Sequence, residues 1–397
     1  MTAEAVDFRI SDELRSELRQ WRNRAAVVGA AGAVLTAVGM VAVSANQFYR
    51  SYLWAYLFVL GLTLGPMAWL MLQYVTGGAW GAVIRRPAEA AARTLPLVAV
   101  MFLPVVLGMN NLYPWMPVHH PHLPAHQAQW LAPGFFLARA AVYFAGWLVL
   151  GWLFNRWSAE EDREGGLAAH GRMSRLAGPG LVFWGLAVSF MSIDWILSVK
   201  PEWFSTMFPL LAIAGQALTS MAFLVALLVL LSFRRPMSEV LTPRHLHDLG
   251  KFLLALVMVW AYFSFSQFLI IWAGNLPEEI PWYKVRLNHG WDVVALLLVL
   301  GHFALPFALL LSRDLKRNYK LLAGIAGFIL IMRLVDLYWQ VTPYFRATGF
   351  GVSWLDFTAP AGLVGLWLAY FLTQLEKRPL MAPNEPALEE VLAHGRE

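Results

Sequence analysis

The chain has 397 residues, of which 59% are hydrophobic and only 14% are charged. A soluble domain has about half apolar and about a quarter charged residues, so this composition predicts a polytopic membrane protein. The chain contains no cysteine, which excludes protein-ligated iron–sulfur clusters, covalent haem attachment and cysteine-ligated zinc within it. The net charge of +5 does not indicate a nucleic-acid partner, because the basic residues lie in short loops where they set membrane topology.

The N-terminal segment, residues 1–24, is rich in arginine and is predicted to form a cytoplasmic amphipathic helix at the membrane interface, with Ser11 and Asp12 near its start. A secretory signal peptide has a short apolar core and a small-residue cleavage site. Here a long polar segment precedes a full-length apolar run instead, so no cleavage is expected.

Ten apolar runs are long enough to cross a hydrocarbon layer of about 30 Å at a rise of about 1.5 Å per residue. They cover residues 25–44, 51–74, 94–110, 132–154, 176–198, 205–233, 247–273, 289–311, 318–339 and 354–375. The expected fold is an all-α polytopic membrane protein. We expect two four-helix units, 51–198 and 203–345, flanked by spans 25–44 and 354–375, with a cytoplasmic tail at 376–397.

The distribution of Lys and Arg predicts the orientation of these spans. Of the 30 basic residues, 23 fall on one side of the ten-span arrangement, five on the opposite side and two, Arg139 and Arg333, within spans. Cytoplasmic loops carry the excess of Lys and Arg. Both termini are therefore expected in the cytoplasm of a bacterium, with the protein in its inner membrane.

A weak internal repeat favours two units in the same orientation, that is, parallel repeats. Two patterns recur: Trp54 with an Arg85–Pro87 turn is echoed by Trp203 with Arg234–Pro236, and Asp194 with Pro201 is echoed by Asp336 with Pro343.

Charged residues within the spans gather in one layer near the outer face. Asp194 lies in the apolar stretch 176–204, where a carboxylate either has a partner and a function or reaches headgroup water. We expect ion pairs between Arg139 and Asp194, and between Arg333 and either Asp336 or Asp292. Asp356 belongs to the same layer and is predicted to take part in structural pairing.

A second interpretation of the polar residues is a proton path, because intramembrane histidines and carboxylates can exchange protons near neutral pH. It would begin at His289 and Asp292 and reach His302 near mid-membrane, with about 15 Å between the last two. Water or other helices would have to fill that gap. Asp336 and, at the inner side, Asp248 and Lys251 complete the candidate path.

The outer loop carries four close histidines, His119, His120, His122 and His126, together with four prolines and no carboxylate or cysteine. This composition favours a stiff segment that packs on a partner. We expect no metal site there.

Several long motifs resemble one family. The stretch SIDWILSVKPEWFSTMF (192–208), with LYPWMP (112–117), FFLARAAVYFAGW (135–147), NRWS (155–158) and the ten-span pattern, is similar to the smaller NrfD-like membrane subunits of bacterial alternative complex III, the ActF family. The resemblance runs through essentially the whole chain.

The resemblance implies a function in electron transport. In that family the complex oxidises menaquinol at the outer face and passes electrons through an iron–sulfur subunit and c-type haem subunits to a periplasmic carrier. It implies partnership with those subunits, with a larger NrfD-like subunit and with lipid. Quinol oxidation is assigned mainly to the larger subunit, and no motif carries a quinone pocket over to this chain. The implied role is therefore a structural and proton-conducting subunit that is not catalytic alone.

Two other functional classes compete with this interpretation. A secondary transporter also combines repeats with intramembrane charges, but its sites usually lie near the midplane, beside Gly or Pro breaks in paired helices. A b-type cytochrome needs two deeply buried histidine ligands, and only His302 qualifies.

Overall fold

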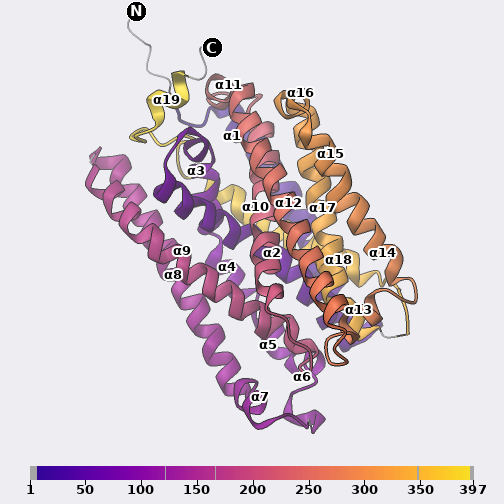
Figure 1. Ribbon diagram of the computed structural model, residues 1–397. Helices are drawn as coiled ribbons and strands as arrows, with labels where there is room; N and C mark the ends of the chain where they lie inside the picture. The colour runs from indigo at the N-terminus through magenta and orange to yellow at the C-terminus, as the bar shows by residue number, and fades with distance from the viewer. Residues whose placement is uncertain (1–6, 121, 166, 347, 394–397) are drawn as a thin grey trace, which may run out of the picture.

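The computed structural model describes residues 7–120, 122–165, 167–346 and 348–393, and Figure 1 shows them as a bundle of long helices. Ten helical segments in these ranges are long and apolar enough to cross a membrane. The chain is therefore an all-α polytopic membrane protein, which confirms the predicted fold class. All ten predicted spans have a counterpart in the structure.

The spans follow in chain order and are named as in Figure 1. They are α1 (Asp12–Ala42), α2 (Ala45–Thr76), α3 to α5 (Ala79–Ala92, Leu95–Val100, Leu103–Leu107), α8 (Pro133–Glu164), α9 (Leu167–Trp195), α10 (Met207–Leu231), α12 (Pro243–Gly274), α14 with the π-helical η3 and α15 (Trp291–Leu297, Leu298–Ala304, Leu305–Leu311), α17 (Tyr319–Val341) and α18 (Leu355–Leu375).

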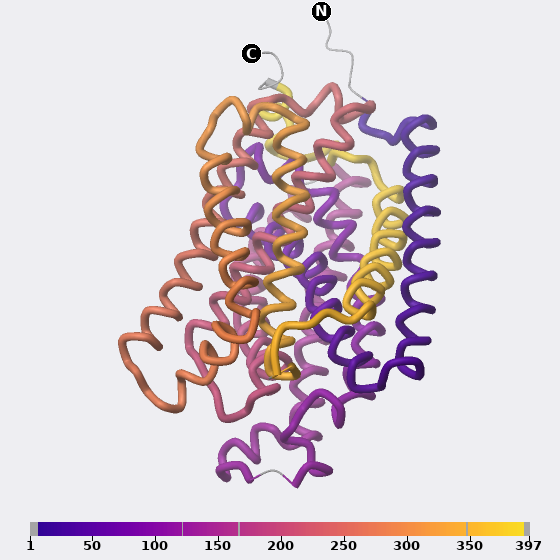
Figure 2. The backbone as a smooth tube through the Cα atoms, turned by 90° about the vertical axis from the view of Figure 1, so that its right-hand side faces the viewer, coloured from indigo at the N-terminus to yellow at the C-terminus, as the bar shows by residue number. Residues whose placement is uncertain are grey.

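Shorter helical segments connect the spans. At one end of the bundle lie α6 (Met109–Leu112), η1 (Pro117–His119), α7 (Ala125–Trp130), η2 (Leu197–Val199), α13 (Pro281–Arg286) and η4 (Thr342–Phe345). At the other end lie α11 (Met237–Val240), α16 (Arg313–Arg317) and α19 (Leu388–Ala393). The start of α1 and the segment around α19 lie at the same end, as an even number of spans requires (Figure 2).

The N-terminal segment is not a separate interfacial helix. Ser11 caps α1, since its hydroxyl accepts a hydrogen bond from the Leu14 N–H, and the helix then runs without a break into the first span. Leu14 and Leu18 are fully buried and Arg22 pairs with Glu376. Residues 12–24 are therefore the first turns of the same helix as the first span and pack on the protein itself, and residues 1–6 of the predicted segment lie outside the described residues.

The third span is the other correction. The Arg85–Pro87 segment, predicted to be a turn, lies inside α3, and the helical segment that contains the third span begins at Ala79. Helix α3 tolerates Pro87 because proline only removes one helical hydrogen bond and bends the axis. Breaks after Ala92 and Val100 divide the rest of the span into α4 and α5.

The centre of the bundle is the pair α2 and α10, the first helices of the two predicted units. Helix α2 packs on α3, α9 and α10, whereas α10 packs on α12, α17 and α2. The flanking helices α1 and α18 lie side by side (Figure 2). They approach closely because glycines face each other: a Cβ on Gly29 would come within 2.4 Å of the Leu366 backbone nitrogen, the small-residue contact typical of membrane helix pairs.

We predict that the end of the bundle with α7, named the outer end below, faces outward, and that the opposite end, named the inner end, faces the cytoplasm together with both termini. Because the chain has no native cysteine, single cysteines at His122 and at Glu164, both exposed, can be labelled in intact cells and in inverted vesicles. The first should react from outside and the second from inside. Reaction of both from the same side would contradict this topology. Glu161 is unsuitable as a labelling position because it is buried.

Candidate functional site

Asp194 forms the best-satisfied charged group at the outer end of the first unit. Its carboxylate receives two hydrogen bonds from Arg139, at 2.7 and 2.9 Å, one from the Tyr143 hydroxyl at 2.8 Å and one from the Trp130 indole at 3.0 Å. The Arg139 guanidinium also lies over the Trp130 ring, 4.0 Å from its centre. Asp194 is fully buried, so the alternative that it reaches headgroup water is wrong, and the predicted pairing with Arg139 is confirmed.

Three of the motifs that carry the family resemblance, LYPWMP, FFLARAAVYFAGW and the stretch that begins SIDW, meet around this ion pair. Tyr113 of LYPWMP donates a hydrogen bond to the Trp195 carbonyl oxygen at 3.2 Å, and its neighbour Trp115 packs on Phe136 of the FFLARA run. Arg139 belongs to that run and Asp194 to SIDW. Segments separated by about 80 residues in the sequence are thus joined at one place.

Asp356 makes a second outer pair, at the start of α18. Its carboxylate contacts Arg346 at 3.3 Å and accepts hydrogen bonds from the Ser51 hydroxyl at 2.6 Å and from the Gln47 amide at 3.2 Å. These contacts join α18 to the first turns of α2. The pairing predicted for Asp356 is observed, and its contacts hold the start of α18 against α2.

In the second unit, Asp336 pairs with Arg333 one turn earlier on the same helix, so Asp292 is not the partner. Asp336 Oδ2 also accepts from Trp260 of α12 at 3.2 Å and from Gln340 at 3.0 Å. Arg333 packs against α10, where a Cβ on Gly215 would lie 2.3 Å from its Nη2. A side chain at position 215 would therefore require the Arg333 guanidinium to shift from this place.

His302 lies beside this cluster and is fully buried. Its ring packs edge-on against Trp260, with centres 4.3 Å apart, and both ring nitrogens lack a hydrogen-bond partner among the described residues. The residue sits in the π-helical segment η3, a distortion that often marks a functional site. Trp260 thus contacts both His302 and Asp336, and the sequence alone did not indicate this bridge.

His289 and Asp292 are placed differently from the other path candidates. Both are exposed at the outer start of α14, where the Asp292 carboxylate accepts a hydrogen bond from the Gly290 N–H at 3.0 Å. His302 has no hydrogen bond to either of them in the described part of the chain. The structure brings His302 and Asp336 together through Trp260, but it does not bring His289 and Asp292 to them.

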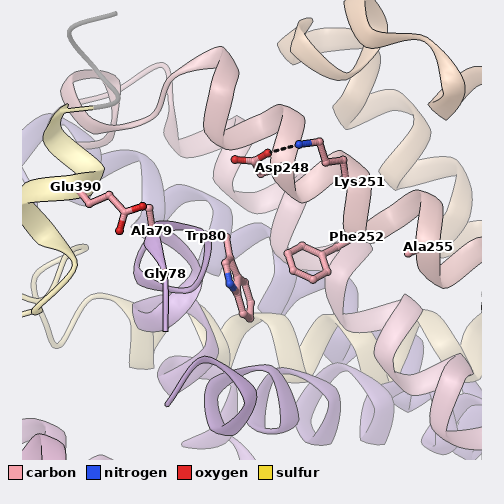
Figure 3. A pocket seen from close by; sticks show the side chains of 8 residues that line it. All are labelled: Gly78, Ala79, Trp80, Asp248, Lys251, Phe252, Ala255 and Glu390. Atoms are coloured by element: carbon pink, nitrogen blue, oxygen red, sulfur yellow. Dashed lines mark hydrogen bonds and ion pairs between the residues drawn. The ribbon is translucent and has the colours of Figure 1, made fainter. Parts of the chain in front are cut away.

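Asp248 and Lys251, the inner candidates, pair with each other at 2.8 Å and line a cavity of about 410 Å³ (Figure 3). Glu390 of the C-terminal segment lies on the opposite side of this cavity. The rings of Trp80 and Phe252, with centres 4.7 Å apart, line the same cavity. The lining therefore combines charged side chains with aromatic rings.

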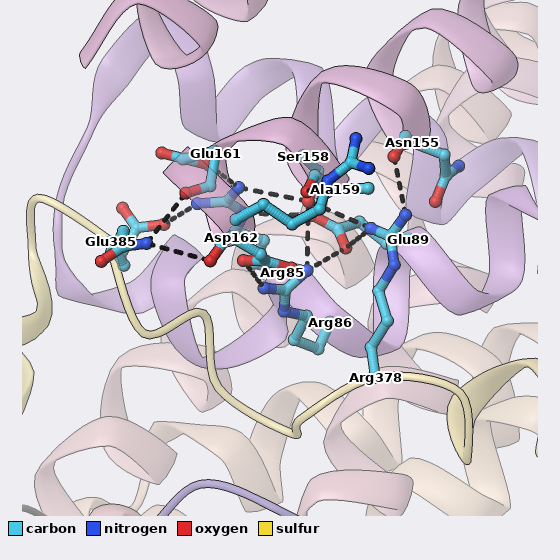
Figure 4. A network of polar contacts seen from close by, with 12 residues as sticks. Arg85, Arg86, Glu89, Asn155, Ser158, Ala159, Glu161, Asp162, Arg378 and Glu385 are labelled. Atoms are coloured by element: carbon cyan, nitrogen blue, oxygen red, sulfur yellow. Dashed lines mark hydrogen bonds and ion pairs between the residues drawn. The ribbon is translucent and has the colours of Figure 1, made fainter. Parts of the chain in front are cut away.

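The largest buried charge cluster is at the inner end of the first unit and was missed by sequence reasoning. Arg85, fully buried, pairs with Glu89 at 3.1 Å, with Glu385 at 2.5 Å and with Glu161. Figure 4 shows the side chains of α3, α8 and the C-terminal segment meeting there. Its other members are Arg86, Arg93, Arg378, Asn155, Ser158, Asp162 and His170.

This inner cluster has as many arginines as carboxylates, four of each. Such balance is what permits burial, because an unpaired charge in an apolar interior costs several kcal/mol. One signal in the sequence was the Arg85–Arg86 pair followed by Glu89, which lies on one helix face at i, i+3 and i, i+4. The partners from α8 and the C-terminal segment could not be inferred from spacing.

Arg286, the last residue of α13, is another fully buried arginine. It has no carboxylate partner in the described residues; instead it donates to the carbonyl oxygens of Trp282, Trp339 and Gln340, at 2.6 to 3.1 Å. Two of these carbonyls belong to the last turn of α17, where free carbonyls and the helix dipole favour a cation. Burial lowers the pKa of Arg286 to about 10, so it remains charged at neutral pH.

The described residues contain no group of three His, Asp or Glu side chains that could hold a metal ion. In the outer loop, the His119 ring is hydrogen-bonded to the Asn110 carbonyl oxygen at 2.7 Å. In comparisons with known proteins, the chain matches no protein-family model and no curated protein. Its residues and their geometry are therefore the basis for a functional proposal.

The Asp194 cluster makes a direct prediction about stability. Arg139→Leu leaves a buried carboxylate without its cation and should lower the free energy of unfolding by about 3–5 kcal/mol. Unfolding of the detergent-purified protein measures the change. Arg156→Leu, which removes an exposed arginine from the same helix, is the matched control. The double variant Arg139→Leu/Asp194→Leu should recover part of the loss. If Arg139→Leu and Arg156→Leu lower the free energy of unfolding by the same amount, the Arg139–Asp194 pair does not stabilise the fold.

Proposed function

We propose that this chain is an integral membrane subunit of a menaquinol-oxidising electron-transfer complex of the alternative complex III type, in which it gives structural support and a proton path. The observation that carries the proposal is the convergence of LYPWMP, FFLARA and SIDW on the Asp194–Arg139 pair. Motifs that resemble one family at three separate positions also form one packed site. The absence of cysteine fits a subunit whose redox centres, haem c and iron–sulfur clusters, lie in partner subunits.

The proton path belongs, in this proposal, to the second unit. His302 and Asp336 form its buried middle, with Trp260 between them. His289 and Asp292 lie at its outer end, and Asp248 and Lys251 at its inner end. Water would have to join these groups, because side-chain contacts do not connect all of them.

A secondary transporter is the second candidate function, since two of the spans are interrupted. The interruptions are the breaks between α3, α4 and α5 in span 3 and the π-helical segment in span 8. Transporter sites usually lie between broken helices in corresponding positions of two repeats. Here the broken spans are the second of one unit and the third of the other, so this pattern does not favour a transporter.

Co-purification tests the proposed complex. An affinity-tagged copy, expressed in the source bacterium and isolated in mild detergent, should bring with it haem c absorbance, an iron–sulfur protein and quinol:acceptor activity. The chain purified alone should show neither haem absorbance nor quinol oxidation, because it has no redox ligand of its own. Isolation from native membranes without any redox subunit, together with solute uptake by reconstituted vesicles, would support the transporter instead.

The proton path is tested in the reconstituted complex. His302→Phe removes the buried imidazole while keeping most of its volume, and Asp292→Asn removes a titratable group at the outer end. Both complexes should assemble, oxidise quinol and move fewer protons per electron than wild type. His122→Phe, in the exposed outer loop, is the control. An unchanged proton-to-electron ratio in His302→Phe would exclude a path through this residue. If the ratio is unchanged only in Asp292→Asn, the path does not begin at Asp292.

A further inference from the structure

A cavity of about 780 Å³ lies at the outer end of the molecule, at the junction of the two units. Its walls come from α7, the end of α9 with η2, the connection to α10 and the first turn of α10. Small-molecule sites have volumes of about 300–1,000 Å³, so this cavity is large enough for a ligand. It is separate from the proton-path residues of the second unit.

The lining selects the chemistry of the ligand. No Asp, Glu, Lys or Arg side chain lines the cavity; most of the lining is apolar, including the aromatic rings of Trp130, Trp203 and Phe204. The polar side chains are His126, Gln127 and three hydroxyl residues. Since a charged ligand would have no counter-charge here, the lining fits a neutral molecule that carries hydrogen-bonding groups on a flat, apolar body.

Two of the aromatic walls are held in place by specific contacts. Trp130 donates to Asp194 and lies under the Arg139 guanidinium. Trp203 donates to the Glu279 carbonyl oxygen at 2.9 Å and stacks on Trp282, with ring centres 4.0 Å apart. A site with fixed walls loses little conformational entropy when it binds a ligand. The Asp194–Arg139 pair thus positions one wall of the cavity.

The geometry points to a binding site for a lipid-soluble quinone in this chain. A quinone ring can pack on the aromatic rings that line the cavity, and its oxygens can exchange hydrogen bonds with the His126 imidazole, which both donates and accepts. The apolar tail fits the remaining lining. The assignment concerns binding alone, and it rests on the proposed function for the choice of quinone among neutral ring compounds.

Binding is measured on the full chain in lipid nanodiscs with menaquinone-4 as the probe. Wild type should bind about one molecule per chain in a saturable manner. Thr206→Trp fills the cavity without removing a side-chain cap of α10 and should weaken binding at least tenfold. His126→Ala should weaken it about fivefold, the effect of one lost hydrogen bond. The controls are Leu210→Trp, on the next turn of α10 outside the cavity, and His122→Ala; both should bind as wild type does.

Three outcomes would overturn this assignment: absence of saturable binding, equal affinity in wild type and both cavity variants, or loss of co-purifying phospholipid from Thr206→Trp without any change in quinone affinity. The last result would identify a lipid site. The co-purification experiment tests the proposed complex independently of quinone binding. A chain that brings redox subunits with it but binds no quinone would refute only the quinone site.

Discussion

Burial of charge among apolar helices is the constraint on which the rest of this structure depends. Such a charge is tolerated only with a partner, and the chain supplies partners of three kinds. Arg139 has the Asp194 carboxylate, which accepts four hydrogen bonds, Arg85 has three carboxylates from different segments, and Arg286 has the carbonyls at the end of α17. Because at least one partner of each arginine comes from another element, each charge also fixes how two elements pack.

The same constraint explains which features could be predicted from the sequence. Spans are visible because hydrophobic length is a local property, and the pairing of Arg139 with Asp194 follows from two isolated charges at similar depth. The inner cluster could not be predicted in this way. Arg85 looks like part of a loop when read locally, and its partner Glu385 lies 300 residues away in a segment with no strong pattern. Only the packed structure shows that the charges neutralise one another.

One of the two repeated sequence patterns corresponds to a similar local structure in both units. Helices α9 and α17 both carry an aspartate near their outer ends, at 194 and 336, and both are followed by a 3-10 turn, η2 and η4. The pairing differs, since Asp194 takes its arginine from α8 and Asp336 takes one from its own helix. The other pattern is not matched: Arg85 lies inside a helix, whereas Arg234 lies in a turn and pairs with Glu17. Helices α9 and α17 thus end in a similar way, but the buried charges of the two units are paired differently.

These differences separate groups that hold the fold from groups that could change protonation. Both oxygens of Asp194 accept hydrogen bonds, and the carboxylates of the inner cluster face arginines, so a proton on any of them would displace a strong partner. In the second unit, the three donors to Asp336 all reach Oδ2, and His302 has no partner for either ring nitrogen among the described residues. A group with unused acceptor capacity can accept a proton without losing an existing hydrogen bond. The second unit therefore suits the proposed proton path better than the first, in which the Asp194–Arg139 pair instead holds one wall of the outer cavity in place.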